Sequence, residues 1–238
     1  MTLSRRHLLR SLGLGSLGAV GALATGCPRK PTTIADAGSG APAPFAPTVA
    51  IPDDDGPPPL PSRDGTGGLG ETGALVCEPT ADNIEGPFWK PGSPFRAQLS
   101  DAKTRGIYMS IGGQVFGGDC RPLAGATLDV WHADGAGEYD NTGWRLRGRL
   151  TSDQDGRWHV DSVVPGNYLN GSRFRPRHVH FKLVAPGHRE LTTQLYFPGD
   201  PYNDGDAWFV ASLMLAQVGP SRDSPGFWGR FDFVLEPA

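Results

Sequence analysis

The stretch His178–Val184 reads HVHFKLV, so that polar and apolar residues alternate almost one by one. Alternation with a period of two predicts a β-strand with one face toward a core and the other toward polar surroundings. Short runs of this kind, separated by turn residues, recur through the second half of the chain, at 107–116, 126–131, 147–152, 157–164, 191–197 and 231–235. Many short strands with regular turns favour an antiparallel β-sandwich.

The predicted fold class is therefore all-β, an antiparallel sandwich with long loops, over residues 75–238. The segment from 122–126 (PLAGA) to 166–168 (GNY) resembles a prealbumin-like module. Helical periodicity is weak in the predicted sandwich. The one segment where it favours a helix is Ala207–Gln217, just after the turn at Asp200-Pro201. The pattern of a sandwich does not by itself reveal a function, which has to come from particular side chains.

The first 26 residues are typical of an export signal rather than of a folded element. Arg5-Arg6 is followed by a mild, glycine-rich apolar stretch over 11–25. This pattern resembles the twin-arginine signal, which directs folded proteins across the bacterial inner membrane. A chance Arg-Arg in an ordinary secretory signal is the alternative.

Residues 24–27, ATGC, are similar to a lipobox, in which the cysteine receives a lipid. The match is incomplete, because the leucine usually found three places before the cysteine stands four places before it, at Leu23. We expect a periplasmic or cell-envelope lipoprotein held at a membrane through Cys27. Whether the inner or the outer membrane holds it stays open.

Residues 27–74 are predicted to form a disordered tether between that anchor and the sandwich. The segment holds ten of the 23 prolines and an acidic run at 53–55. It lacks apolar periodicity, so it cannot bury enough surface to offset its ordering entropy. A proline-rich docking ligand is the alternative interpretation.

Two further cysteines, Cys77 and Cys120, follow the tether. An exported protein meets an oxidising compartment, which favours a disulfide between them, with two buried free thiols as the alternative. The formal net charge of the chain is −3, and no basic block follows the first ten residues. Nucleic acid is not expected as a partner, since phosphates are bound by clustered Lys and Arg.

Two histidines and two tyrosines carry the chemistry that the sequence predicts. His178 and His180 lie two apart on a predicted strand, so their side chains share a face and can share one ion. Imidazole suits iron, zinc, copper or nickel, so the pair does not identify a metal. A His-x-His pair on a strand is more often incidental or structural than catalytic. Tyr139 and Tyr168 each follow a glycine-containing loop. A metal cation can deprotonate a phenol, and tyrosinate favours ferric iron, although a core aromatic is the commoner fate of a tyrosine.

Six motifs, in the same order, resemble those of the intradiol ring-cleavage dioxygenases, the superfamily of catechol and protocatechuate dioxygenases. The likeness runs from about Cys77 to the C-terminus. The motifs are 85–89 (EGPFW), 125–134 (GATLDVWHAD), 146–148 (LRG), 165–168 (PGNY), 175–181 (RPRHVHF) and 191–197 (LTTQLYF).

The resemblance implies a non-haem Fe(III) centre with the ligands Tyr139, Tyr168, His178 and His180. It also implies an oxidoreductase of aromatic compound catabolism, which cleaves a catechol-type substrate with dioxygen to a muconate-type diacid. Tyr168 would leave the metal and take a substrate proton. Arg175 would stabilise negative charge on the substrate, and Gln194 would hydrogen-bond the same region. From the residues alone, a surface salt bridge for Arg175 and a strand-edge position for Gln194 stay open.

The chain departs from the family pattern in two places. The interval from Tyr168 to His178 is short, and Asn170 stands where protocatechuate enzymes have a tryptophan, so the identity of the catechol stays open. A tether also stands in place of the helical dimerisation region of catechol dioxygenases, which leaves the oligomeric state open, a homo-oligomer included. The alternatives are a non-catalytic envelope lipoprotein with a prealbumin-like binding domain and a zinc hydrolase.

Overall fold

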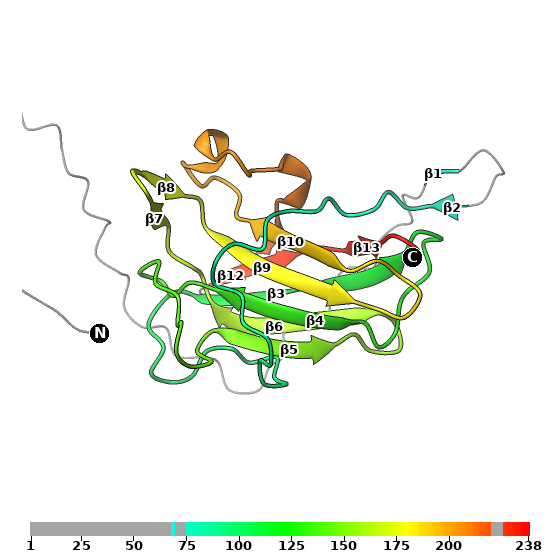
Figure 1. Ribbon diagram of the computed structural model, residues 1–238, viewed down its shortest axis with the longest axis horizontal. Helices are drawn as coiled ribbons and strands as arrows, with labels where there is room; N and C mark the ends of the chain where they lie inside the picture. The colour runs from blue at the N-terminus through cyan, green and yellow to red at the C-terminus, as the bar shows by residue number, and fades with distance from the viewer. Residues whose placement is uncertain (1–67, 70–74, 220–225) are drawn as a thin grey trace, which may run out of the picture. The chain divides into compact units, whose positions relative to one another are not determined.

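The computed structural model of the chain describes residues 68–69, 75–219 and 226–238 (Figure 1). The predicted signal at 1–26, the anchor at Cys27 and nearly all of the predicted tether lie outside the described residues. The strands are β1 Gly68–Leu69, β2 Leu75–Val76, β3 Tyr108–Gly117, β4 Thr127–His132, β5 Arg147–Thr151, β6 Arg157–Val163, β7 Tyr168–Asn170, β8 Arg173–Arg175, β9 His178–Val184, β10 Leu191–Tyr196, β11 Ala216–Gly219, β12 Phe227–Arg230 and β13 Phe233–Leu235.

Two main sheets form the sandwich, and the predicted fold class is confirmed. One sheet has the order β10-β9-β4-β5, with every pair antiparallel. The other has the order β11-β12-β3-β13, and β6 also pairs with β3. Figure 1 shows the first sheet in front of the second. A two-residue pairing of β1 with β2 lies at the end of the predicted tether, which therefore has one ordered element too short for periodicity to reveal.

The core lies between the two sheets and is built from the inner side chains of their strands. On β9 these are Val179, Phe181 and Leu183, each fully buried. Phe181 contacts Trp158 of β6 and Phe233 of β13, with ring centroids 5.2 and 5.1 Å apart. The alternation in the sequence therefore becomes one apolar face per strand, as expected, and Trp158 lies in this core.

Two expectations about secondary structure are wrong in detail. β12 and β13 both pair with β3 in parallel, because the chain returns to this sheet only after the long excursion that follows β10. The helix expected at Ala207–Gln217 is absent. Two 3₁₀ turns, η1 Asn203–Gly205 and η2 Ala211–Leu213, and strand β11 occupy the region. Leu213 and Leu215, two residues apart, are both buried, which extended backbone allows.

Residues 78–100, which we call the strap, cross the outer face of the β10-β9-β4-β5 sheet (Figure 1). The strap is bonded to β10 by the N–H of Asn83, which donates to the carbonyl of Thr192 (2.8 Å), and to β5 by the N–H of Arg96, which donates to the carbonyl of Arg149 (2.8 Å). It thus covers a sheet face that the second sheet does not reach.

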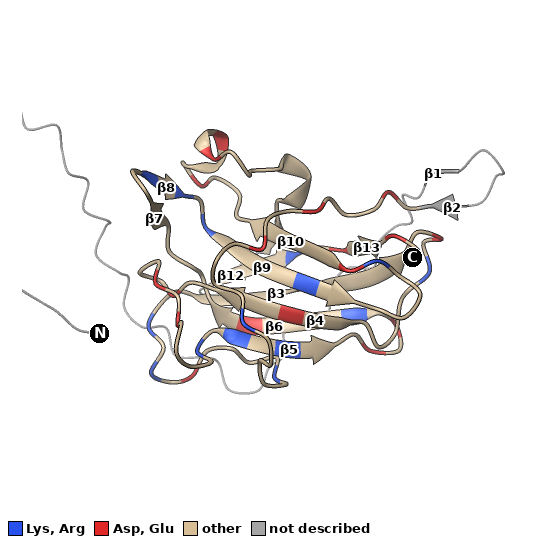
Figure 2. Ribbon diagram, viewed as in Figure 1, with Lys and Arg blue, Asp and Glu red and all other residues tan. Residues whose placement is uncertain are grey.

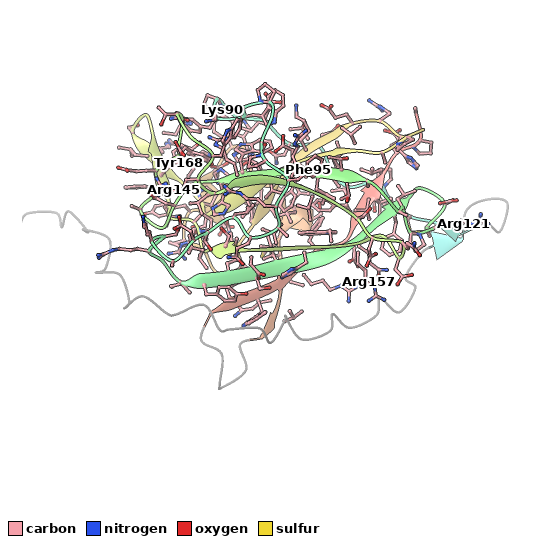
Figure 3. All side chains as sticks on the ribbon, turned by 90° about the horizontal axis from the view of Figure 1, so that it is seen from below. Lys90, Phe95, Arg121, Arg145, Arg157 and Tyr168 are labelled. Atoms are coloured by element: carbon pink, nitrogen blue, oxygen red, sulfur yellow. A yellow bond between two sulfur atoms is a disulfide. The ribbon has the colours of Figure 1, made fainter. Side chains whose placement is uncertain are left out.

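A disulfide joins Cys77, just before the strap, to Cys120 in the turn after β3, so this expectation is confirmed. The labels in Figure 3 place Arg121, next to Cys120, at the end of the domain opposite to Tyr168. The strap therefore begins at one end of the sandwich and runs over the sheet that carries the predicted site. Among the described residues, no helix has the length and apolar character needed to cross a membrane.

Candidate metal centre

The outer face of the β10-β9-β4-β5 sheet presents its side chains in rows that run across the strands. One row, the site row, consists of Gln194, His180, Trp131 and Arg147, which lie opposite one another in register. The next row along the strands, the charged row, consists of Thr192, Lys182, Asp129 and Arg149. Figure 2 shows the charges of this second row as blue, red and blue on β9, β4 and β5.

His178 and His180 both point to the outer face, as the strand pattern predicts. Their ring centroids are 4.8 Å apart. The Nδ1 atom of His178 lies 2.6 Å from the carbonyl of Pro176, to which it donates when it carries the proton. This leaves the lone pair of Nε2 free to face the site.

Both tyrosines reach this histidine pair from loops at the same end of the sheet. The Tyr139 hydroxyl lies 3.3 Å from Nε2 of His178. The ring centroids of Tyr139 and Tyr168 are 5.6 Å apart, and those of Tyr168 and His178 are 5.7 Å apart. Two donors at ~2.1 Å from one ion lie about 3 Å apart, so the Tyr139 and His178 donors are spaced as ligands of one ion would be.

Glycines allow the two tyrosine loops to meet. Gly137 has a positive φ of 86°, and a Cβ there would lie 2.4 Å from the carbonyl oxygen of Asn167. A Cβ on Gly166 would lie 2.6 Å from the carbonyl oxygen of Gly135. The loop before Tyr139 and the loop before Tyr168 therefore touch backbone to backbone, which any larger side chain would prevent.

Asp134 orders the loop that carries Tyr139. Its Oδ1 atom accepts the backbone N–H groups of Ala136 (2.9 Å) and Glu138 (3.0 Å). Asp134 therefore positions the loop. The carboxylate of Asp129, on the neighbouring strand, does not take part, because it accepts from Ser93 and Trp89 of the strap.

Burial sets the protonation of both histidines and of Tyr139. It lowers the pKa of His178 to about 3 and the pKa of His180 well below its usual value, so both imidazoles are neutral at pH 7. Burial also raises the pKa of the Tyr139 phenol above its usual range. Neutral imidazoles are the form that binds metals, whereas the phenol needs a nearby cation to become a ligand.

The donor set fits a metal that accepts nitrogen and phenolate oxygen. In the described part of the chain, no three His, Cys, Asp or Glu side chains gather in a way that could hold an ion. An ion at the histidine pair would therefore take its remaining protein ligands from the tyrosines. Nδ1 of His180 is buried and has no partner within the described chain. The structure thus brings Tyr139, Tyr168, His178 and His180 together, and their assignment as ligands stays a prediction.

Arg175 lies in the same site and forms an ion pair with Asp206. Its residue is 3 % exposed. Nε donates to Asp206 Oδ2 at 2.7 Å and Nη2 to Oδ1 at 3.3 Å. Burial alone would lower the pKa of Arg175, but the hydrogen bonds to Asp206 and Tyr168 raise it overall. Its guanidinium also stacks on Trp208, 4.7 Å from the ring centroid. The salt bridge is real, but it is buried rather than at the surface.

Gln194 holds the strap against the site. Its Nε2 atom donates to Oδ1 of Asn83 (3.0 Å) and to the carbonyl of Ile84 (2.9 Å). Its Oε1 atom is buried and has no partner among the residues described. β10 is an edge strand of its sheet, yet Gln194 is fully buried because the strap covers it. The atom it has left for a ligand is an acceptor, which can bind only a group that carries a proton.

Trp131 and three further histidines lie outside the predicted ligand set. Trp131 is buried in the site row, where its ring stacks on His180 with centroids 4.8 Å apart. His132 is buried on the inner face, with Nε2 2.8 Å from the hydroxyl of Ser162. His159 contacts Ser110 on the other sheet, and His188 is partly exposed. None of these histidines reaches the tyrosine pair.

Three residues that lie next to the site were not predicted from the sequence. Asp206 lies in the excursion after β10, and no pattern marks it. Phe88 stacks on Tyr139, with ring centroids 4.2 Å apart and planes at 19°. Arg147 is the fourth member of the site row. The motifs EGPFW and LRG contain the last two residues, but nothing in the sequence brings either near Tyr139.

The fold and the site together define a β-sandwich protein in which two histidines and two tyrosines lie together on the outer face of one sheet. The family model described as Dioxygenase matches residues 84–237. The chain therefore belongs to the intradiol ring-cleavage dioxygenase superfamily. The match begins within the strap and ends one residue before the C-terminus, so it includes every residue discussed above as part of the site.

Relatives and solved structures agree with this family. The chain is 37% identical over 145 residues to catechol 1,2-dioxygenase 2 of Acinetobacter lwoffii. This match covers 52% of this chain and 53% of that protein. It is 34% identical over 179 residues to a 6-chlorohydroxyquinol 1,2-dioxygenase of Cupriavidus pinatubonensis, covering 66% and 65%. The chain thus spans about half to two thirds of the length of these curated relatives.

Among solved structures, the dioxygenase domain of a dioxygenase–carbohydrate-binding protein fusion from Streptomyces sp. SirexAA-E has a TM-score of 0.62 at 45% identity. The match covers 68% of this chain and all of that domain. The 3-chlorocatechol 1,2-dioxygenase of Rhodococcus opacus 1CP has a TM-score of 0.64 at 26% identity, covering 67% and 73%.

Proposed function

We propose that this protein is an Fe(III)-dependent intradiol dioxygenase that cleaves a catechol-type aromatic with dioxygen to a muconate-type diacid. The observation that carries the proposal is the convergence of Tyr139, Tyr168, His178 and His180 on one point of the outer sheet face. Two phenols and two neutral imidazoles suit ferric iron, and the family membership adds the catechol substrate.

Ferric iron held by these residues would act as a Lewis acid and as a template for the catecholate. The chain's own side chains supply the rest. Tyr168 Oη is the atom that takes up a substrate proton. Arg175, fixed by Asp206 and Trp208, presents a planar cation beside Tyr168 and stabilises negative charge that develops on the substrate.

The strap keeps water away from this chemistry. Phe88 lies against the rings of both tyrosines, with centroids 4.2 Å from Tyr139 and 6.0 Å from Tyr168. Gly86 lies close to His180, since a Cβ there would come within 3.4 Å of its Cε1 atom. Excluding water strengthens each electrostatic interaction in the site.

The reaction and the metal are tested together. Purified full-length protein is expected to contain iron in a 1:1 ratio and to be reddish from tyrosinate-to-iron charge transfer. Under air it should consume one dioxygen per catechol, with both oxygen atoms recovered in the diacid. A colourless protein with stoichiometric zinc, or a ring-cleavage product other than the intradiol diacid, would contradict the proposal. A panel of substituted catechols then identifies the substrate.

The non-catalytic alternative is less well supported. A binding lipoprotein has no need for Tyr139, Tyr168, His178 and His180 to lie together, yet they do. A zinc hydrolase has no need for two tyrosines among its ligands. Metal content separates these alternatives, because the binding protein should copurify with none and the hydrolase with zinc.

Export and lipid anchoring are proposed on residues 1–27, which lie outside the described part of the chain. One structural observation supports them, namely the disulfide between Cys77 and Cys120, which suits an oxidising compartment. In a bacterial host, labelled fatty acid should be incorporated into the wild type and not into Cys27→Ser. Replacement of Arg5-Arg6 by Lys-Lys should retain the precursor in the cytoplasm. Unchanged export and labelling in both variants would contradict this part.

A further inference from the structure

Arg147 is a buried arginine next to the site that the chemistry above does not use. Its residue is 2 % exposed. Nε donates to the carbonyl of Asp140 at 3.0 Å, and Nη1 donates to the carbonyl of Phe88 at 2.6 Å. Nη2 is buried and has no partner in the described chain. The guanidinium therefore joins two segments that are far apart in the sequence.

Both of these segments contact Tyr139. Asp140 follows Tyr139 directly in the chain, so its carbonyl group fixes the backbone on one side of the tyrosine. Phe88 stacks on the Tyr139 ring at a centroid distance of 4.2 Å. One guanidinium thus holds the backbone next to Tyr139 and the ring that lies against it, and the fork geometry of arginine suits this two-armed contact.

The charge of Arg147 is balanced differently from that of Arg175. Asp206 forms a buried ion pair with Arg175 at 2.7 Å. The two acceptors of Arg147 are neutral backbone carbonyls. Burial lowers the pKa of Arg147, and the charges of Asp140, Tyr139 and Asp129, in that order, act in the opposite direction. Negative charge on Tyr139 would therefore add to the compensation that the two carboxylates supply to this buried cation. A phenolate at position 139 and the cation at 147 would therefore stabilise each other.

We propose that Arg147 is a positioning residue for Tyr139, which it clamps through Asp140 and Phe88 and whose phenolate charge it balances when a metal is bound. The inference rests on the proposed iron site. Tyr139 is then the firmly held tyrosinate, whereas Tyr168 begins the β7–β8 hairpin beside Arg175, which is ion-paired with Asp206. Arg175 also attracts negative charge at Tyr139, so Arg147 is distinguished by its two-armed contact.

The experiment compares Arg147→Gln and Arg147→Lys with wild type and with Arg149→Gln. Arg149 is a matched control, because it lies two residues along on β5, on the same face, and donates from Nε to the carbonyl of Ser93 (2.7 Å) instead. Measurements are the visible charge-transfer band, the tyrosinate bands in resonance Raman spectra and the rate of iron loss to a chelator. Near-UV circular dichroism checks that each variant is folded.

We expect Arg147→Gln to shift the charge-transfer band and to release iron at least about tenfold faster, as is typical when a group that supports a metal ligand is lost. Arg147→Lys keeps the charge without the two-armed contact, so its band position and its rate of iron release should lie between those of the wild type and Arg147→Gln. If Arg147→Gln does not fold, the comparison of Arg147→Lys with the wild type tests the proposal. Arg149→Gln should keep the wild-type band and release rate.

A Tyr168→Phe background identifies the tyrosine through which Arg147 acts. There the remaining tyrosinate band belongs to Tyr139, and Arg147→Gln should still shift it. An unchanged band and release rate in both Arg147 variants would overturn the inference alone, as would an effect that vanishes in this background. A wild-type protein that binds no iron would overturn the proposed function and this inference together.

Discussion

Strand β9 has two faces, formed by alternating residues of the same seven-residue segment, and they have different roles. The inner face, Val179, Phe181 and Leu183, packs in the core between the sheets. The outer face, His178, His180 and Lys182, is covered by the strap and carries the predicted metal ligands. The second sheet packs on the inner face of β9 with apolar side chains, whereas the strap, with its own polar backbone, buries imidazoles and leaves their ring nitrogens available as ligands.

The inner face should determine stability, and Phe181→Ala tests this with the largest expected effect. Loss of a fully buried phenyl ring leaves a cavity, so the free energy of unfolding should fall by about 3–5 kcal/mol. Urea denaturation of the metal-free protein measures the change. The iron content per folded molecule should stay that of the wild type, and a large loss of iron would mean that the two faces are not independent.

The strap is attached to the rest of the domain by the disulfide, which closes a loop with a sequence separation of 43. Replacement of Cys77 and Cys120 together by serine should lower the free energy of unfolding by about 2–4 kcal/mol, because the unfolded chain gains entropy. Thermal unfolding with and without reductant checks this. The hydrogen bonds of Asn83 and Gln194 should still hold the strap over the site, so that iron content is kept. Loss of the iron would show that those bonds are insufficient.

On the outer face, Tyr168→Phe should reduce kcat for catechol by about 10²-fold, since one oxygen at the reacting centre is lost. The free energy of unfolding should change little, because the ring remains. Tyr202→Phe is the control. This tyrosine is exposed, and its ring contacts Phe174 of the β7–β8 hairpin. Steady-state kinetics of the two variants at equal iron content make the comparison, and equal activities would remove Tyr168 from the site.

His132 is a buried titratable residue on the inner face of the sheet, and it predicts a pH dependence of stability. Burial lowers its pKa to about 4, from about 6.5 in an unfolded chain. The unfolded state therefore binds the proton more tightly, and stability is lost as pH falls below about 6.5. Between pH 7 and pH 5 this residue alone should cost the metal-free protein about 2 kcal/mol.

Urea denaturation at the two pH values measures that loss. His132→Gln should show a smaller decrease than the wild type, although its stability at pH 7 is lower. His178 and His180 titrate in the same direction and remain in both proteins, so the difference between the two isolates His132. Equal decreases would show that the buried imidazole of His132 does not contribute.

The sequence was informative wherever a signal is local. A period of two located the strands, and the spacing of His178 and His180 placed both on one face. It was uninformative where contacts join distant segments. Asp206 meets Arg175 only because the excursion after β10 folds back over the hairpin, and Phe88 meets Tyr139 only because the strap crosses the sheet. The parallel pairing of β12 and β13 depends on that same excursion, whose direction no periodicity reports.

The position of the disulfide also determines at which end the domain can be linked to a surface or to a fusion partner. Cys77 enters the folded region beside Cys120, at the end remote from Tyr168 (Figure 3). A bead, an electrode or a fusion partner linked upstream of Leu75 would therefore be joined at the far end. Immobilisation through the N-terminal side leaves the tyrosine loops facing the solution, whereas linkage through the β7–β8 hairpin would obstruct them.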